Sequence, residues 1–170
     1  MSGYRSPGAT VRGPVQRVRL PLLDRLMDAD PGAPEPPPPS AAVALKTLRD
    51  AVRRDLEAVL NARRRRRPVP ALYQELVLSP LTYGIPDATS GAYAVPERRA
   101  ALAREVEATI RRFEPRLMDI QVELVGDGDD LSRALRLRVN AVLRADPVPE
   151  PVSFETTLEP VTRDVTVQEG

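Results

Sequence analysis

The strongest constraint on this chain is a change of hydrophobic period on the two sides of Pro115. The apolar residues before this proline recur at the spacing of one helix face, namely Leu102, Val106, Ile110 and Phe113. The apolar residues after it alternate with polar residues, as in a half-buried strand, namely Ile120, Val122 and Leu124. Because proline disfavours helical geometry in the residue before it, the helix should end at about Phe113. The sequence therefore predicts a helix, a corner and a strand in direct succession.

Two opposite charges flank that proline, Glu114 and Arg116. A guanidinium can grip a carboxylate with two parallel hydrogen bonds, so the two side chains could form an ion pair. One interpretation is an ordinary exposed corner whose ion pair contributes little to stability. The other is a functional site, because clustered ionisable residues point to function. A pair that serves a partner would be dispensable for folding, whereas a buried internal pair would not.

Composition narrows the chemistry that such a corner can perform. The chain has 170 residues, with 25 Lys and Arg against 24 Asp and Glu, and a formal net charge of +1. This balance does not point to nucleic acid, an anionic membrane or an acidic substrate. The absence of Cys and His excludes disulfides, zinc sites built on thiolates or imidazoles, and nucleophilic catalysis that depends on histidine. Asp127, Asp129 and Asp130 resemble half a calcium loop but lack the spaced terminal Glu of an EF-hand, so we expect no metal, and we expect no cofactor.

The chain carries no visible targeting or membrane signal. Residues 1–14 contain no apolar run, and no stretch approaches the ~20 apolar residues of a membrane span. We therefore expect a soluble, cytoplasmic protein without direct membrane insertion.

Residues 1–39 are predicted to form an N-terminal arm. Residues 1–19 are rich in Gly, Pro and Arg and are expected to be disordered. A short leucine-rich helix follows, with Leu22, Leu23 and Leu26 as its candidate docking residues. These leucines dock either on the chain's own domain or on a partner. The proline-rich residues 31–39 are typical of an extended spacer.

Residues 40–170 are predicted to form one α+β domain, with two main helices packed on one face of a small, mainly antiparallel sheet. Ser40 is a suitable N-cap for the first helix, whose apolar stripe is Leu45, Leu48, Val52, Leu56, Val59 and Leu60. Residues 68–95 are broken by Pro and Gly, and Tyr83–Asp87 is predicted to be a turn pinned to the core. Alternating apolar residues predict further strands around 135–141, 152–158 and 161–167.

Five consecutive arginines, Arg63–Arg67, follow the first helix. They could contact a phosphate backbone, which would make the chain a nucleic-acid-binding module. No aromatic residue is interleaved with them to stack on bases, so we favour a solvated helix end that complements the helix dipole, or docking on an acidic protein surface. Arg63, Arg64 and Arg65 are the candidate docking residues.

Several motifs occur along the chain in an order that resembles one family. They are Leu22–Leu26, Arg53–Glu57 with Leu60–Arg64, Ser79–Asp87, Phe113–Leu117 and Val152–Thr156. In this order and with these gaps, the chain resembles the TssE family, the baseplate wedge subunits of type VI secretion systems. That family is similar to the wedge proteins of contractile-tailed phages and is often labelled lysozyme-like.

The resemblance implies a structural protein that is not an enzyme. It implies assembly with TssF-like and TssG-like subunits into a wedge, contact with TssB/TssC-like sheath subunits that nucleates the contractile sheath, and TssK as a further candidate partner. The location implied is the cytoplasmic baseplate at the inner membrane. By the same resemblance, the partner-binding residues are Phe113, Glu114, Pro115, Arg116 and Leu117. An open sheet edge could also accept a partner strand, with the late strands between Val152 and Val167 as candidates.

The lysozyme-like label raises a glycan hydrolase as the main alternative. Glycan hydrolysis requires two carboxylates that flank a cleft. Glu114 is the only acid in a notable setting, and the adjacent Arg116 would favour its ionised form, whereas a general acid must hold a proton. The sequence therefore favours a structural role.

Overall fold

A computed structural model describes most of the predicted domain and a short part of the arm. The described residues are 22–27, 39–64, 69–70, 72–86, 95–125, 134–146, 148–159 and 164–170. Several predictions lie outside these ranges, namely the disorder of residues 1–19, most of the proline-rich spacer, and the positions of Arg65–Arg67.

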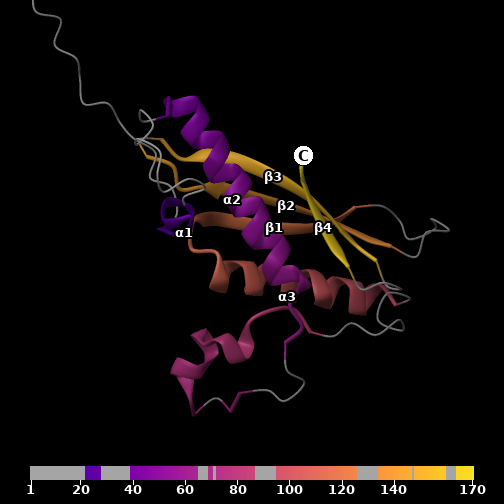
Figure 1. The fold of residues 1–170 in the computed structure, drawn as a ribbon. Coiled ribbons are helices and arrows are strands. Elements are labelled where there is room, and N and C mark those ends of the chain that lie inside the picture. The colour runs from indigo at the N-terminus through magenta and orange to yellow at the C-terminus, as the bar shows by residue number, and fades with distance from the viewer. Residues whose placement is uncertain are drawn as a thin grey trace, which may run out of the picture.

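The described chain is an α+β fold, as predicted (Figure 1). Its helices are α1 (Leu22–Leu26), α2 (Ala41–Asn61), the 3-10 turns η1 (Gln74–Leu78) and η2 (Pro80–Thr82), and α3 (Pro96–Phe113). Its strands are β1 (Leu117–Val125), β2 (Leu135–Leu143), β3 (Glu150–Leu158) and β4 (Val165–Glu169). The four strands pair in sequence order, β1-β2-β3-β4, and every pairing is antiparallel.

Helix α2 begins where the sequence pattern places it but ends at Asn61, before the arginines into which the helix was expected to run, whereas α3 ends at Phe113 as predicted. The hydroxyl oxygen of Ser40 accepts a hydrogen bond from the N–H of Val43, so Ser40 caps α2. Pro96 occupies the first turn of α3, where its missing N–H costs nothing. At the other end of α3, Glu114 is the C-cap residue, and its N–H donates to the carbonyl of Ile110.

The core lies between the two helices and one face of the sheet. Along β2 and β3, alternate side chains are buried, as the alternation predicts, and Val139 and Phe154 lie opposite each other with almost no exposure. The opposite face is polar: Arg138 pairs with Glu155 across the strands at 2.9 Å. Contacts join α2 to β4 and α3 to β1, so both helices cover the buried face.

An irregularity near its start shapes β1. The register with β2 shifts between Met118 and Gln121, and Asp119 adopts a φ of 50°. Aspartate tolerates this left-handed conformation better than most residues. The bulge brings both Leu117 and Val122 opposite buried residues of β2. The expected half-buried alternation weakens along the strand, because Ile120 is buried, Val122 is half-buried and Leu124 is exposed at the outer edge.

The prediction that the late strands offer an open edge is wrong for β3. This strand pairs with β2 on one side and β4 on the other. β4 is an edge strand, and the bonds from Glu159 to Asp164 and from Gly170 to Ser153 show that the even-numbered backbone groups of β4 face β3. Val165 and Val167 therefore direct their backbone groups outward.

Helix α2 covers part of that outer edge. The side-chain amide of Asn61 accepts from the N–H of Val165 and donates to its carbonyl, both at 2.9 Å. The carbonyl of Val167 accepts from Arg53 at 3.4 Å. Asn61 thus occupies the hydrogen-bonding position of a neighbouring strand, and β4 is not a free edge at Val165.

The predicted leucine-rich helix is present as α1, but it does not dock on its own domain. Leu22, Leu23 and Leu26 are 67%, 60% and 71% exposed. Docking on a partner remains the open alternative for these three residues.

Candidate functional site: the Glu114–Arg116 corner

The corner between α3 and β1 is built around a buried carboxylate. Glu114 is only 3% exposed, so the interpretation as an ordinary exposed corner is wrong for this residue. The guanidinium of Arg116 donates from Nε and Nη2 to the two carboxylate oxygens of Glu114. The backbone N–H of Arg116 also donates to Oε1 of Glu114, at 3.3 Å. This bidentate grip satisfies the carboxylate without solvent.

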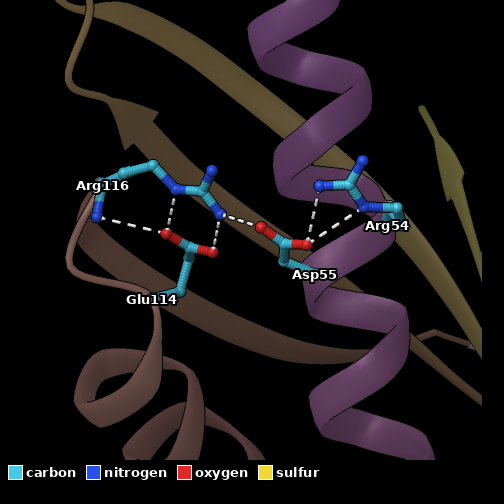
Figure 2. Close-up of polar contacts among 4 residues, drawn as sticks. All are labelled: Arg54, Asp55, Glu114 and Arg116. Carbon is cyan, nitrogen blue, oxygen red and sulfur yellow. Dashed lines mark hydrogen bonds and ion pairs between the residues drawn. The ribbon is translucent and has the colours of Figure 1, made fainter. Parts of the chain in front are cut away.

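A third side chain, which sequence reasoning missed, connects the corner to α2. Nη2 of Arg116 also donates to Oδ2 of Asp55 at 2.6 Å, and Oδ1 of Asp55 accepts from Arg54 at 3.2 Å. Figure 2 shows the four side chains as a row of alternating charge from the corner to α2. The signal that could have identified Asp55 is its position between buried Val52 and Leu56, at the border of the apolar stripe.

The electrostatics of the corner hold Arg116 in its charged form. Burial acts against that charge, but the hydrogen bonds and negative charges of Glu114 and then Asp55 outweigh it and raise the pKa of Arg116 above its usual range. Burial, followed by the charges of Asp55 and Glu114, also raises the pKa of Tyr83. The hydroxyl of Tyr83 therefore lies in a negative field.

A surface pocket of about 390 Å³ lies beside the corner. Its lining residues are Asp55, Val59, Tyr83, Phe113, Glu114, Pro115 and Arg116. The rings of Tyr83 and Phe113 meet edge to face, with centroids 5.2 Å apart. The pocket therefore combines an aromatic wall with the ionic row.

Gly84 positions Tyr83 at this pocket. Its φ is 98°, and a Cβ on this residue would lie 2.3 Å from the carbonyl oxygen of Ala62. The close approach allows Ile85 to donate to Ala62 at 3.1 Å and to accept from Arg64 at 2.9 Å. Because Ile85 is 1% exposed, the prediction of a turn pinned to the core is confirmed for residues 83–86.

The five residues of the predicted partner-binding motif have different environments. Pro115 is exposed, and the side chain of Arg116 is 23% exposed. Phe113 is half-buried against the core, and its ring lines the pocket. Glu114 and Leu117 are buried. In this conformation Pro115, Arg116 and part of Phe113 are therefore the members of the motif that a partner can reach.

A known protein family matches the part of the chain that contains this corner. The family model for baseplate wedge protein gp25 matches residues 46–148, more than half of the chain. The chain belongs to the baseplate wedge protein gp25 family. The matched region runs from α2 through the corner to the end of β2, so it includes every residue of the ionic row. Comparison with individual curated proteins gives no match.

Two of the arginines that follow α2 have partners within this gp25-family chain. Arg63 donates to the carbonyl of Leu60, in the last turn of α2, at 3.0 Å. This contact agrees with the interpretation of a cation that complements the helix end. Arg64 donates to Glu105 of α3 at 3.0 Å.

The two carboxylates at the pocket share one hydrogen-bond donor. Arg116 donates to both Asp55 and Glu114 through the same guanidinium. Within the described ranges there is no group of acidic residues that could hold a metal ion. No helix in that same part of the chain is long and apolar enough to cross a membrane.

Proposed function

We propose that the chain is a structural baseplate subunit of a type VI secretion system. It assembles with TssF-like and TssG-like subunits into the wedge, meets TssB/TssC-like sheath subunits and nucleates the contractile sheath, with TssK as a further partner. Its location is the cytoplasmic baseplate at the inner membrane. The gp25-family match and the order of the TssE-like motifs support this proposal.

The observation that carries the proposal is that the corner combines side chains that are held in place with an exposed residue. Glu114 and Asp55 fix the guanidinium of Arg116 between α2 and β1. Pro115, which lies between Glu114 and Arg116 in the sequence, is exposed. A surface held in one geometry before binding loses little conformational entropy when a partner docks, which favours a structural subunit of a defined assembly.

The sheet offers a second contact, at β1 rather than at the late strands. The hydrogen bond from Arg144 to Arg116 shows that the even-numbered residues of β2 direct their backbone groups toward β1. After the register shift, their partners in β1 are the odd-numbered residues, so the backbone groups of Val122 and Leu124 point outward. Within the described chain, β1 pairs only with β2. This edge can therefore accept a strand from a sheath or wedge subunit.

Co-expression with TssF-like and TssG-like subunits tests the proposal. The wild-type chain should co-purify with both subunits. Pro115→Ala should fold normally but bind them about tenfold more weakly, because it alters an exposed contact at the corner. Pro151→Ala, at an exposed proline of β3, is the control and should bind normally. A wild-type chain that co-purifies with neither subunit would contradict the proposal.

Hydrolysis is the rival that the pocket makes testable. Two carboxylates lie beside it, and both accept hydrogen bonds from Arg116. We expect no release of fragments from peptidoglycan by the wild-type chain. Turnover that disappears in Glu114→Gln would instead establish the glycan hydrolase.

A further inference from the structure

The segment between α2 and α3 exposes large apolar side chains over a short length. We call residues 72–83 the lobe; Figure 1 shows it in magenta, extending beyond α3 on the side away from the sheet. Six of its side chains are 36% to 84% exposed: Leu72, Tyr73, Leu76, Leu78, Leu81 and Tyr83. Glu75 is its only charged residue, in a chain that is 29% charged. Exposed apolar patches of this kind mark interaction sites.

The lobe has a defined structure of its own. The hydroxyl of Ser79 donates to the carbonyl of Leu76 at 2.7 Å, and the hydroxyl of buried Thr82 donates to the carbonyl of Val77 at 2.6 Å. The Gly84–Ile85 contact with Ala62 then fixes its end against α2. These bonds hold the 3-10 turns with their leucines directed outward, so the exposed side chains form an ordered surface.

The lobe is continuous with the pocket at the corner, because Tyr83 belongs to both. The pocket lining holds two acidic residues, Asp55 and Glu114, and one basic residue, Arg116; Arg54, which also donates to Asp55, does not line the pocket. The Tyr83 and Phe113 rings form the aromatic wall. The pKa of Tyr83 is raised first by burial and then by the charges of Asp55 and Glu114, so both acids act on its hydroxyl. A cation is therefore the favoured occupant of the pocket, and aromatic faces attract cations further.

We propose that the lobe and the pocket form one docking surface for an apolar segment of a wedge partner that carries a basic side chain. The apolar residues of that segment cover the lobe. Its basic side chain enters the pocket against Asp55 and the aromatic wall. Arginine fits best, because its planar guanidinium stacks on rings and pairs with a carboxylate. This inference rests on the proposed function and adds the partner's chemistry to it.

Two substitutions of an exposed apolar residue by serine test the apolar half of the surface. Leu78→Ser lies in the lobe, and its matched control, Val148→Ser, replaces an exposed apolar residue elsewhere; the two side chains are 67% and 68% exposed. In co-purification with TssF-like and TssG-like subunits, Leu78→Ser should lower affinity about tenfold, whereas Val148→Ser should not. Equal affinity of the two variants would overturn the proposal.

Two substitutions of opposite charge at one position test the basic half. Tyr83→Lys and Tyr83→Glu both remove the ring, but the lysine supplies the chain's own cation to the pocket and the glutamate adds a further acid. The Lys variant should therefore bind the wedge subunits at least about tenfold more weakly than the Glu variant. Equal binding, or the reverse order, would overturn a basic occupant. Each variant is first shown by its thermal melt to fold.

The same variants distinguish a wedge partner from other occupants of this surface. They also distinguish failure of this inference from failure of the proposed function. A melt that drops in Leu78→Ser would mean that another part of the same chain covers the lobe. Loss of a wild-type dimer in Leu78→Ser, measured by light scattering, would mean that a second copy does so; either result overturns the proposal. If wild type binds the wedge subunits and no lobe variant matters, only this inference fails. If wild type binds neither subunit, the proposed function fails with it.

Discussion

The corner and the lobe invert the usual distribution of side chains. At the corner, a carboxylate is 3% exposed and its cation is shared with a second acid from α2. In the lobe, Leu72 and Leu78 are 84% and 67% exposed. Buried charges are stable only when they are paired and hydrogen-bonded, and exposed leucines are costly to leave in water. The comparison teaches that the ionic row fixes shape, whereas the apolar lobe is the part that gains most from a partner.

Arg116→Ala should give the largest effect, because it leaves buried Glu114 without its cation. We expect a loss of about 3–5 kcal/mol in the free energy of unfolding, measured with urea. The control is Arg138→Ala, whose pair with Glu155 is exposed on both sides and should contribute about 0.5 kcal/mol. Equal losses would mean that the corner is no more internal than an ordinary surface pair.

Gly84→Ala should have the next largest effect, because it disrupts the contact with Ala62 that fixes the end of the lobe against α2. A Cβ would lie 2.3 Å from the backbone of Ala62, at a φ of 98° that alanine adopts only with strain. A loss of about 3 kcal/mol is expected in the same urea experiment. Gly170→Ala, whose nearest neighbour is at 3.4 Å, should change almost nothing. A stable Gly84→Ala variant would show that the backbone around residue 84 can shift to accept the Cβ.

Asn61→Ala tests whether polar side chains stabilise this fold, because it removes both hydrogen bonds between Asn61 and Val165 of β4. Unfolding should be easier by about 1–2 kcal/mol. Asn61→Asp retains the acceptor for the N–H of Val165 but loses the donor, and its stability should lie between those of wild type and Asn61→Ala. Faster hydrogen exchange at β4 in both variants would locate the effect at this edge.

Leu78→Ala should leave stability within about ±0.5 kcal/mol, since the side chain is exposed before and after folding. The same change at Leu56, which is 1% exposed, should cost about 2–5 kcal/mol. A large loss at Leu78 would break the comparison, because the lobe would then be part of the core.

The smallest effect concerns pH and Tyr83, which belongs to both regions. Its pKa in the folded chain is raised above 10.0, so the folded state holds this proton more tightly than the unfolded state. Its contribution to stability is therefore complete below pH 10 and falls as pH rises through the folded pKa. Tyr83→Phe should lose less stability than wild type between pH 9 and pH 11. Parallel losses would show that neither burial nor the negative field raises the pKa of this hydroxyl.

Local pattern predicted the helix, the corner and the strands, because periods of 3.6 and 2 directly reflect burial. It predicted Glu114 as a partner of Arg116 but not Asp55, since Asp55 lies 61 positions away and meets Arg116 only through the packing of α2 on the sheet. Strand order was equally hidden, and so β3 was mistaken for part of an open edge. The bulge at Asp119 gives no signal in an alternating pattern. Nothing in the sequence of the lobe shows that its leucines point outward.

Side-chain footprinting with hydroxyl radicals tests the central claim most directly. Oxidation rates are measured for the free chain and for the chain assembled with TssF-like and TssG-like subunits. The account predicts that assembly slows oxidation of Leu72, Leu78 and Tyr83, while Val148 keeps its rate. If the lobe residues oxidise equally fast in both states, the lobe does not contact the wedge, and the division between a bracing corner and a binding lobe is wrong.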